Sequence, residues 1–177
     1  LRCLVGSEMC IRDSGYPFHL YLVGEKSSEA MYRACLDAAA EYGVADYVHM
    51  TGNQPQSVCR QYARNALATL LPGEWNRVNI FYEVMGEGCV VLTNNNHSVD
   101  EFIDRGNNCL VYDTEAEAAE QLIALLNDPQ RAQRIRANAH RTAIEQFLTL
   151  EKRFGMEAQL VMDTASGNNT AHYPEII

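Results

Sequence analysis

Two glutamates, separated by eight residues, are the side chains best suited to chemistry in this sequence. Glu74 follows Pro72-Gly73 in an expected loop, and Glu83 lies inside a helix that we expect over residues 79–87. The first backbone N–H groups of such a helix, together with its dipole, attract an anion such as a phosphate. A carboxylate one turn further along can accept two hydrogen bonds from a vicinal diol such as a ribose. Together these features predict a nucleotide site.

The composition limits the classes of partner and site. The chain has 177 residues, enough for one core, and a net charge of −9, which argues against nucleic acid or an anionic membrane as the main partner. No apolar run reaches the ~18 residues of a membrane span. The cysteines beyond residue 14 are isolated, so we expect no zinc site or disulfide framework and a reducing cytoplasm as the compartment. They are Cys35, Cys59, Cys89 and Cys109.

The first fourteen residues look foreign to the rest of the chain. Residues 3–14 can be back-translated into a string that resembles a transposon adapter used in sequencing libraries. We therefore expect residues 1–14 to be non-native, with the true N-terminus missing, and exclude them from the fold. The alternative is a short native strand at Leu4-Val5.

Short apolar segments alternate with helical patterns along the remaining chain. The segments typical of strands are residues 19–24, 47–51, 66–71, 89–93 and 109–112. The segments typical of helices are one that Ser27 or Ser28 caps and Gly43 ends, then 55–65, 79–87, 99–105, 115–127, 130–147 and 151–164.

Strands that are apolar throughout and alternate with helices indicate a parallel sheet covered on both faces. We predict an α/β fold, a doubly wound, Rossmann-like domain over residues 15–165 with C-terminal helices, followed by a loose tail at 166–177. Ligands of such sheets bind beyond the carboxyl ends of the strands. Gly24, Gly52, Pro72-Gly73 and the loop 94–97 follow strands, so we expect them to converge on one rim.

Several motifs occur in a characteristic order, and from them the chain resembles the C-terminal, donor-binding domain of retaining nucleotide-sugar glycosyltransferases of the B-type fold (group 1). The resemblance covers roughly residues 17–162. It implies one half of that fold, with the first strand and the acceptor-binding domain missing. The motifs are Leu20–Gly24, Val48–Gly52, Glu74–Gly88, Val99–Ile103, Gly106–Val111 and Asn138-Ala139.

The resemblance assigns roles to the two glutamates. The family carries two glutamates separated by seven residues, of which the second binds the nucleotide ribose, and Glu83 matches it. The first approaches the donor sugar, and Glu74 is the matching catalytic candidate although its spacing is one residue too long. Asn76 or Asn79 are the alternatives for this sugar contact.

The remaining donor contacts also follow from the resemblance. Arg77 is the basic residue best placed for the diphosphate, Asn79 and Ile80 open the helix, and Gly24 and Gly52 lie on the rim. The resemblance implies a nucleotide-diphosphate sugar as donor, with no metal and no separate cofactor. A glycan, lipid or small-molecule acceptor, and any peripheral membrane contact, would belong to the missing N-terminal domain. We expect the isolated chain to bind donor weakly and to turn over little.

Other functions stay open at this point. A nucleotide-sugar epimerase of the same fold would need acid/base groups facing the donor, for which His97 is the obvious candidate. A non-catalytic nucleotide-sugar-binding module would need none. A glycosidase would use two carboxylates flanking the scissile bond, but the spacing of the glutamates and their fold context favour a nucleotide.

Overall fold

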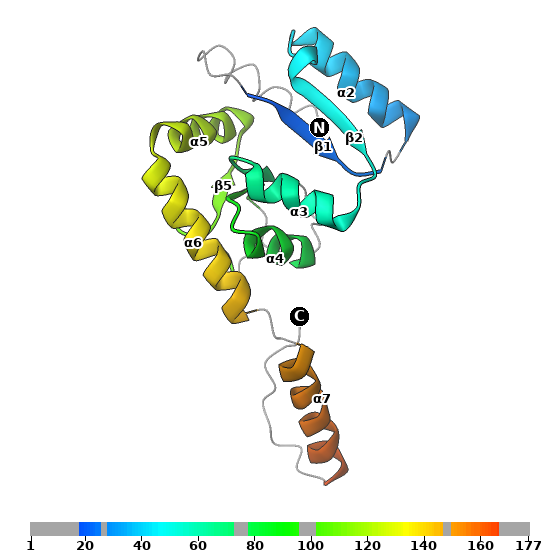
Figure 1. Cartoon of the computed structure of the whole chain (residues 1–177), viewed down its shortest axis with the longest axis vertical. Coiled ribbons are helices and arrows are strands. Elements are labelled where there is room, and N and C mark those ends of the chain that lie inside the picture. The colour runs from blue at the N-terminus through cyan, green and yellow to red at the C-terminus, as the bar shows by residue number, and fades with distance from the viewer. Residues whose placement is uncertain (1–17, 26–27, 73–77, 96–101, 147–149, 167–177) are drawn as a thin grey trace.

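A computed structural model describes residues 18–25, 28–72, 78–95, 102–146 and 150–166 of the chain (Figure 1). Five strands and a series of helices make up this part of it. The strands are β1 (Leu20–Val23), β2 (Val48–Gly52), β3 (Thr69–Leu70), β4 (Val91–Asn94) and β5 (Leu110–Tyr112). The helices are α2 (Glu29–Glu41), α3 (Gln56–Asn65), α4 (Val78–Gly86), α5 (Glu115–Asn127), α6 (Pro129–Gln146) and α7 (Leu150–Ala165), with a short 3-10 turn, η1, at Ala45–Tyr47.

All strand pairs in the described residues are parallel, which confirms the predicted α/β class. The strands form two sheets there, β1-β2 and β3-β4-β5, rather than one continuous sheet. In the first sheet Leu20 pairs with Val48, and in the second Leu92 pairs with Leu70 and with Leu110. Because the strands are parallel, their carboxyl ends share one edge within each sheet.

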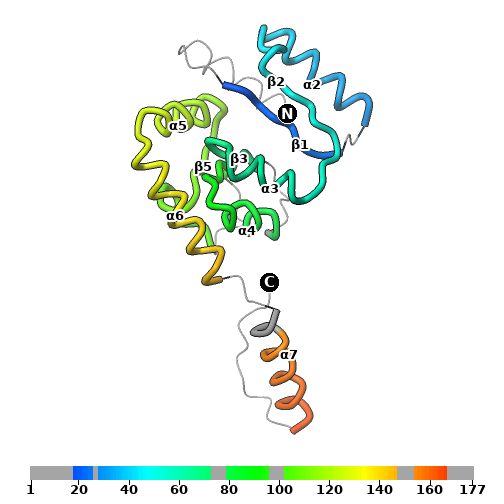
Figure 2. Tube along the Cα trace, in the orientation of Figure 1, coloured from blue at the N-terminus to red at the C-terminus, as the bar shows by residue number. Residues whose placement is uncertain are grey.

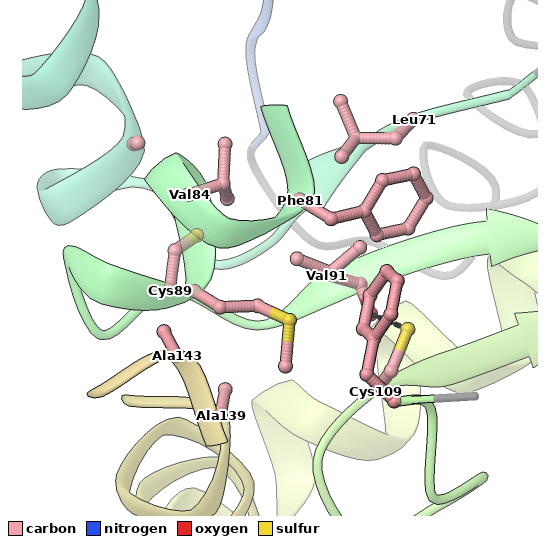
Figure 3. Packing of buried hydrophobic residues seen from close by; sticks show 11 residues of the cluster. Leu71, Phe81, Val84, Cys89, Val91, Cys109, Ala139 and Ala143 are labelled. Carbon is pink, nitrogen blue, oxygen red and sulfur yellow. Dashed lines mark hydrogen bonds between the residues drawn. The ribbon is translucent and has the colours of Figure 1, made fainter. Parts of the chain in front are cut away.

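The strand β4 divides the larger core into two faces. The side chains of Val90 and Leu92 pack with α5 and the first half of α6. Val91 points to the opposite face and packs with α4 and the second half of α6, as Figure 3 shows. Alternate residues of a strand point to opposite faces, and both faces here are covered by helices. The predicted doubly wound packing is therefore confirmed for this sheet.

The smaller sheet packs against α2. Cys35, Ala38 and Ala39 are the buried residues of this helix, and the two alanines pack with Val44 and Val48. The helix begins as predicted, because the Ser28 hydroxyl accepts a hydrogen bond from the Met31 backbone N–H at 3.1 Å.

The third strand is shorter than the predicted residues 66–71. Only Thr69–Leu70 forms the ladder with β4. The carbonyl groups of Ala66 and Leu67 instead accept hydrogen bonds from Nη2 of Arg136 at 2.6 and 3.4 Å. A side chain from α6 thus takes the acceptors that a longer strand would use.

The predicted helix at 99–105 is wrong for its described part. Phe102–Asp104 is not helical, and Arg105 forms an isolated parallel bridge with Cys109. The cause is the buried Asn108 side chain. Its Oδ1 accepts from the Asp104 backbone N–H at 2.8 Å and its Nδ2 donates to the Phe102 carbonyl at 2.9 Å. These bonds replace those of a helix.

The last helices are α6 and α7. The helix α6 contributes to both faces of the larger core, whereas α7 lies apart from the sheets at the bottom of Figure 2. Phe154, Val161 and Met162 of α7 are exposed. Within the described residues, no helix combines the length and the apolar character that a membrane crossing requires.

Candidate functional site

The carboxyl ends of β1 and β2 meet at two glycines. The backbone N–H of Gly24 donates to the Gly52 carbonyl at 3.0 Å. Gly52 has a φ of +70°, and a side chain atom added at either glycine would meet open space within 4 Å. The prediction that Gly24 and Gly52 lie on one rim is confirmed, and neither carries a side chain that would keep a ligand from the backbone.

Side-chain hydrogen bonds shape the loop that follows β2. The Thr51 hydroxyl donates to the Leu22 carbonyl of β1 at 3.2 Å, and the Gln54 amide donates to the Thr51 carbonyl at 2.7 Å. This closes the turn, so that α3 begins at Gln56, only a few residues beyond the end of β2. The start of α3 therefore lies at the rim.

The strands of the larger sheet are tied together at the same ends. The buried Thr93 hydroxyl donates to the Leu71 carbonyl at 2.8 Å, and the Asn95 N–H donates to the Tyr112 carbonyl at 3.0 Å. Nη2 of Arg105 donates to the side-chain oxygen of Asn95 at 2.8 Å. Of the loops predicted at this edge, Pro72, Asn94 and Asn95 are described. Pro72 and Asn95 follow their strands as expected, whereas Asn94 is the last residue of β4.

The helix α4 has a buried side and an exposed side. Phe81 and Met85 are fully buried and belong to one cluster with Val91 of β4 and Ala139 of α6. Figure 3 shows Phe81 in this cluster. Asn79 and Ile80, at the start of the helix, are exposed. Glu83 is exposed as well, and its Oε1 lies 3.5 Å from Nε2 of Gln56, the first residue of α3.

A second contact joins α3 and α4 one turn further from the rim. The Oε2 atom of Glu87 accepts from Nε and Nη2 of Arg64 at 3.1 and 2.5 Å, and Oε1 lies 3.7 Å from Nε of Arg60. The two helices lie side by side in Figures 1 and 2. These contacts hold the end of α4 against the second half of α3, while Glu83 lies beside the start of α3.

The predicted site residues have different outcomes. Gly24 and Gly52 are joined, and Glu83, Asn79 and Ile80 are accessible on α4. The catalytic candidate Glu74 and the diphosphate candidate Arg77 lie outside the described residues, as do Asn76 and His97.

Sequence reasoning missed Gln56, which contacts Glu83. A signal for it exists in the sequence. Gln56, Arg60 and Arg64 recur every fourth residue, which is the spacing of one helix face. Glu83 and Glu87 have the same spacing, so the sequence itself contains two complementary polar stripes.

The buried cysteines are unsuited to catalysis. Cys89 and Cys109 are fully buried, and burial raises the pKa of both thiols, that of Cys109 to about 12. A hydrogen bond with the Thr69 hydroxyl partly opposes the increase in the pKa of Cys89. The thiolate is the reactive form, so Cys89 packs as a small hydrophobe, as predicted. Across the described ranges, no group of three or more His, Cys, Asp or Glu residues could hold a metal ion.

The arrangement at the rim can bind a polyhydroxylated ligand. An exposed carboxylate accepts hydroxyl hydrogen bonds with both oxygens, and bonds to a charged acceptor are stronger than neutral ones. Glu83 offers this group between two helices that both start at the ligand edge of the fold.

The sequence matches the model of a known protein family. A family model described as glycosyl transferase-like matches residues 19–156. Sequence comparison with curated proteins gives no match.

Solved structures with the same fold are numerous at low sequence identity. Sucrose-phosphate synthase from Thermosynechococcus elongatus matches with a TM-score of 0.77 at 17% identity, over 93% of this chain and 43% of that one. Anabaena Alr3699/HepE, solved in complex with UDP, matches with a TM-score of 0.74 at 18% identity, over 90% of this chain and 44% of that one. The chain thus spans less than half the length of either protein.

A structure of a single domain matches over more of its own length. It is the C-terminal domain of LpcC, a glycosyl transferase group 1 family protein from Francisella tularensis. Its TM-score is 0.73 at 11% identity, and the match covers 82% of this chain and 78% of that one. The predicted fold, one Rossmann-like half of a B-type architecture, is confirmed by these neighbours.

Proposed function

Because the chain belongs to the glycosyl transferase-like family, we propose that it binds the nucleotide-diphosphate sugar of a retaining glycosyltransferase. The whole protein would move the sugar from this donor to an acceptor hydroxyl. The neighbour Alr3699/HepE was solved with UDP and, separately, with UDP-glucose, which supports a uridine nucleotide as the first ligand to test.

The position of Glu83 carries this proposal. Its carboxylate is exposed on α4 and lies 3.5 Å from the first residue of α3, beside the edge at which ligands of such sheets bind. We assign it the ribose, whose two hydroxyl groups would donate to the carboxylate oxygens. Glu83 would then orient the donor and would transfer no proton.

The reaction breaks the bond between the anomeric carbon and the diphosphate oxygen. The acceptor oxygen forms a new bond to the same carbon. The nucleotide diphosphate departs with the electron pair of the broken bond and takes up the proton that the acceptor hydroxyl loses. The start of α4 and Arg77 would stabilise the negative charge that develops on the leaving phosphate, without a metal ion. Glu74 would contact the sugar. A retaining transferase leaves the anomeric configuration unchanged.

The acceptor would bind elsewhere. The chain spans less than half the length of neighbours such as sucrose-phosphate synthase, so we assign the acceptor to a second domain of the whole protein. A glycan, a lipid or a small molecule would serve there. The chain alone would bind the donor weakly and turn it over slowly.

Binding of UDP and 2′-deoxy-UDP tests the ribose assignment. We expect wild-type chain to prefer UDP by roughly tenfold or more, because hydrogen bonds to a charged group contribute about 1.5–3 kcal/mol. The substitution Glu83→Gln should remove most of this preference, and Glu120→Gln, at an exposed position on α5, should keep it. Calorimetric titration at millimolar nucleotide measures the affinities for UDP and for 2′-deoxy-UDP in each chain.

Two results would overturn the proposal. A Glu83→Gln chain that still discriminated the two nucleotides would remove Glu83 from the ribose. A wild-type chain that bound neither UDP, GDP nor their sugars at millimolar concentration would remove the nucleotide-sugar site itself.

A further inference from the structure

Two polar stripes face each other between α3 and α4. Gln56, Arg60 and Arg64 are spaced by four residues on α3. Glu83 on α4 and Glu87, in the turn directly after Gly86, have the same spacing. Residues at this spacing share one face of a helix. Because Gln56 meets Glu83 and the two arginines meet Glu87, the helices run in the same direction away from the rim.

The two glutamates have partners of different strength. Glu87 lies away from the rim, its side chain is 14% exposed, and it is held by two guanidinium groups. Hydrogen bonds between two charged groups are short and strong. This pair of contacts fixes α3 against α4 and leaves Glu87 little capacity for a ligand.

Glu83 has a neutral partner. The Gln56 amide lies 3.5 Å from Oε1, at the outer limit of a hydrogen bond, and both side chains are in the exposed surface. A neutral amide at this distance directs the carboxylate without neutralising its charge. Each carboxylate oxygen has two acceptor positions, so one contact to Oε1 leaves the group able to accept from a diol.

We propose that Gln56 is a positioning residue for the nucleotide ribose, because its side-chain amide directs the Glu83 carboxylate toward the rim. This inference rests on the proposed nucleotide-sugar site and deepens it. The two sets of contacts therefore have different roles. Arg60 and Arg64, away from the rim, hold the helices together through Glu87. Gln56, at the rim, orients the Glu83 carboxylate and leaves it able to bind a ligand.

The test is the ratio of the affinities for UDP and 2′-deoxy-UDP in chains with Gln56→Met. Methionine has a similar length and no N–H donor. We expect this substitution to lower the affinity for UDP about three- to tenfold and to leave that for 2′-deoxy-UDP nearly unchanged, since the long contact that orients Glu83 is lost. In a Glu83→Gln background the same substitution should have little further effect, because the two residues act together.

A matched control lies one turn along the same stripe. Arg60→Met removes a side chain that contacts Glu87 and should lower the melting temperature slightly without changing the affinity ratio. If Gln56→Met weakened both nucleotides equally, or left the ratio at its wild-type value, the positioning role would be wrong. A wild-type chain that does not discriminate the two nucleotides would instead refute the ribose assignment of Glu83, which separates the two failures.

Discussion

Gly24 and Gly52 join the ends of β1 and β2 through one backbone hydrogen bond of 3.0 Å, at the edge where the ligand is expected. Gly52 achieves this with a φ of +70°. An L-residue with a side chain is strained in this conformation by about 1–2 kcal/mol. The geometry of the rim therefore depends on a residue without a side chain.

The substitution Gly52→Ala should lower the free energy of unfolding by about 1 kcal/mol, although space exists for the added methyl group. Gly155→Ala, in the middle of α7 and without a positive φ, should not destabilise the chain, since alanine favours a helix over glycine. Urea denaturation of the three proteins measures the difference, and equal losses at the two positions would contradict it.

Asn108→Ala should destabilise the chain by about 2 kcal/mol. Asn108 is 4% exposed, and it serves the Asp104 N–H, the Phe102 carbonyl and the Thr142 hydroxyl. Its removal leaves the buried Phe102 carbonyl and the partly buried Asp104 N–H without these partners, which costs more than the loss of an exposed bond. Asn107→Ala, at the exposed neighbouring position, is the control and should cost less than half as much in the same denaturation experiment.

Ala143→Leu should destabilise the chain by about 1–3 kcal/mol, because α4 and α6 approach too closely for a larger side chain. Ala143 is buried, and a Cβ atom added at Gly86 of α4 would lie only 3.9 Å from its methyl group. Ile144 is the next residue and is 62% exposed, so Ile144→Ala should change stability little. Thermal melting followed by circular dichroism distinguishes the two positions.

Cys109 should resist alkylation in the folded chain. Iodoacetamide at pH 8, read by peptide mass spectrometry, should label the half-buried Cys59 first and reach Cys109 only after unfolding in urea. Rapid labelling of Cys109 under native conditions would contradict its burial.

The same thiol links stability to alkaline pH. Its pKa rises from an ordinary 9.0 to about 12 in the folded chain, so above pH 9 the folded state binds more protons than the unfolded state. Because the folded state holds the extra proton, the free energy of unfolding should fall as the pH rises from 9 toward 12. Below pH 9 the thiol is protonated in both states, so Cys109 contributes no pH dependence there. A Cys109→Ala chain, measured over the same pH range, should show a shallower decline.

Much of the fold follows from local sequence patterns. The apolar strands, the Ser28 cap and the alternation of strands with helices predict a parallel α/β domain. The third strand is shorter than predicted because Arg136 of α6, seventy residues further along the chain, binds the Ala66 carbonyl. Arg136 lies outside any local stretch of sequence around Ala66, so local patterns could not predict this contact.

The site follows from the sequence to a lesser extent. The exposure of Glu83 and the meeting of Gly24 with Gly52 agree with the predicted rim. Which surface Glu83 faces depends on the packing of α3 against α4, and that is set by tertiary contacts. For this reason the contact between Gln56 and Glu83 emerges only from the folded chain. Glu74 and Arg77 stay predictions.

The helix α7 leaves Phe154, Val161 and Met162 in water, apart from the sheets. The described side chains of α7, residues 154–165, therefore contribute little burial, from which most of the stability of a helix in a protein comes. Its amide hydrogens should exchange with deuterium long before those of Val91, Leu92 and Thr93 in β4, which are fully buried. We therefore expect α7 to unfold without disturbing the sheets that carry the rim.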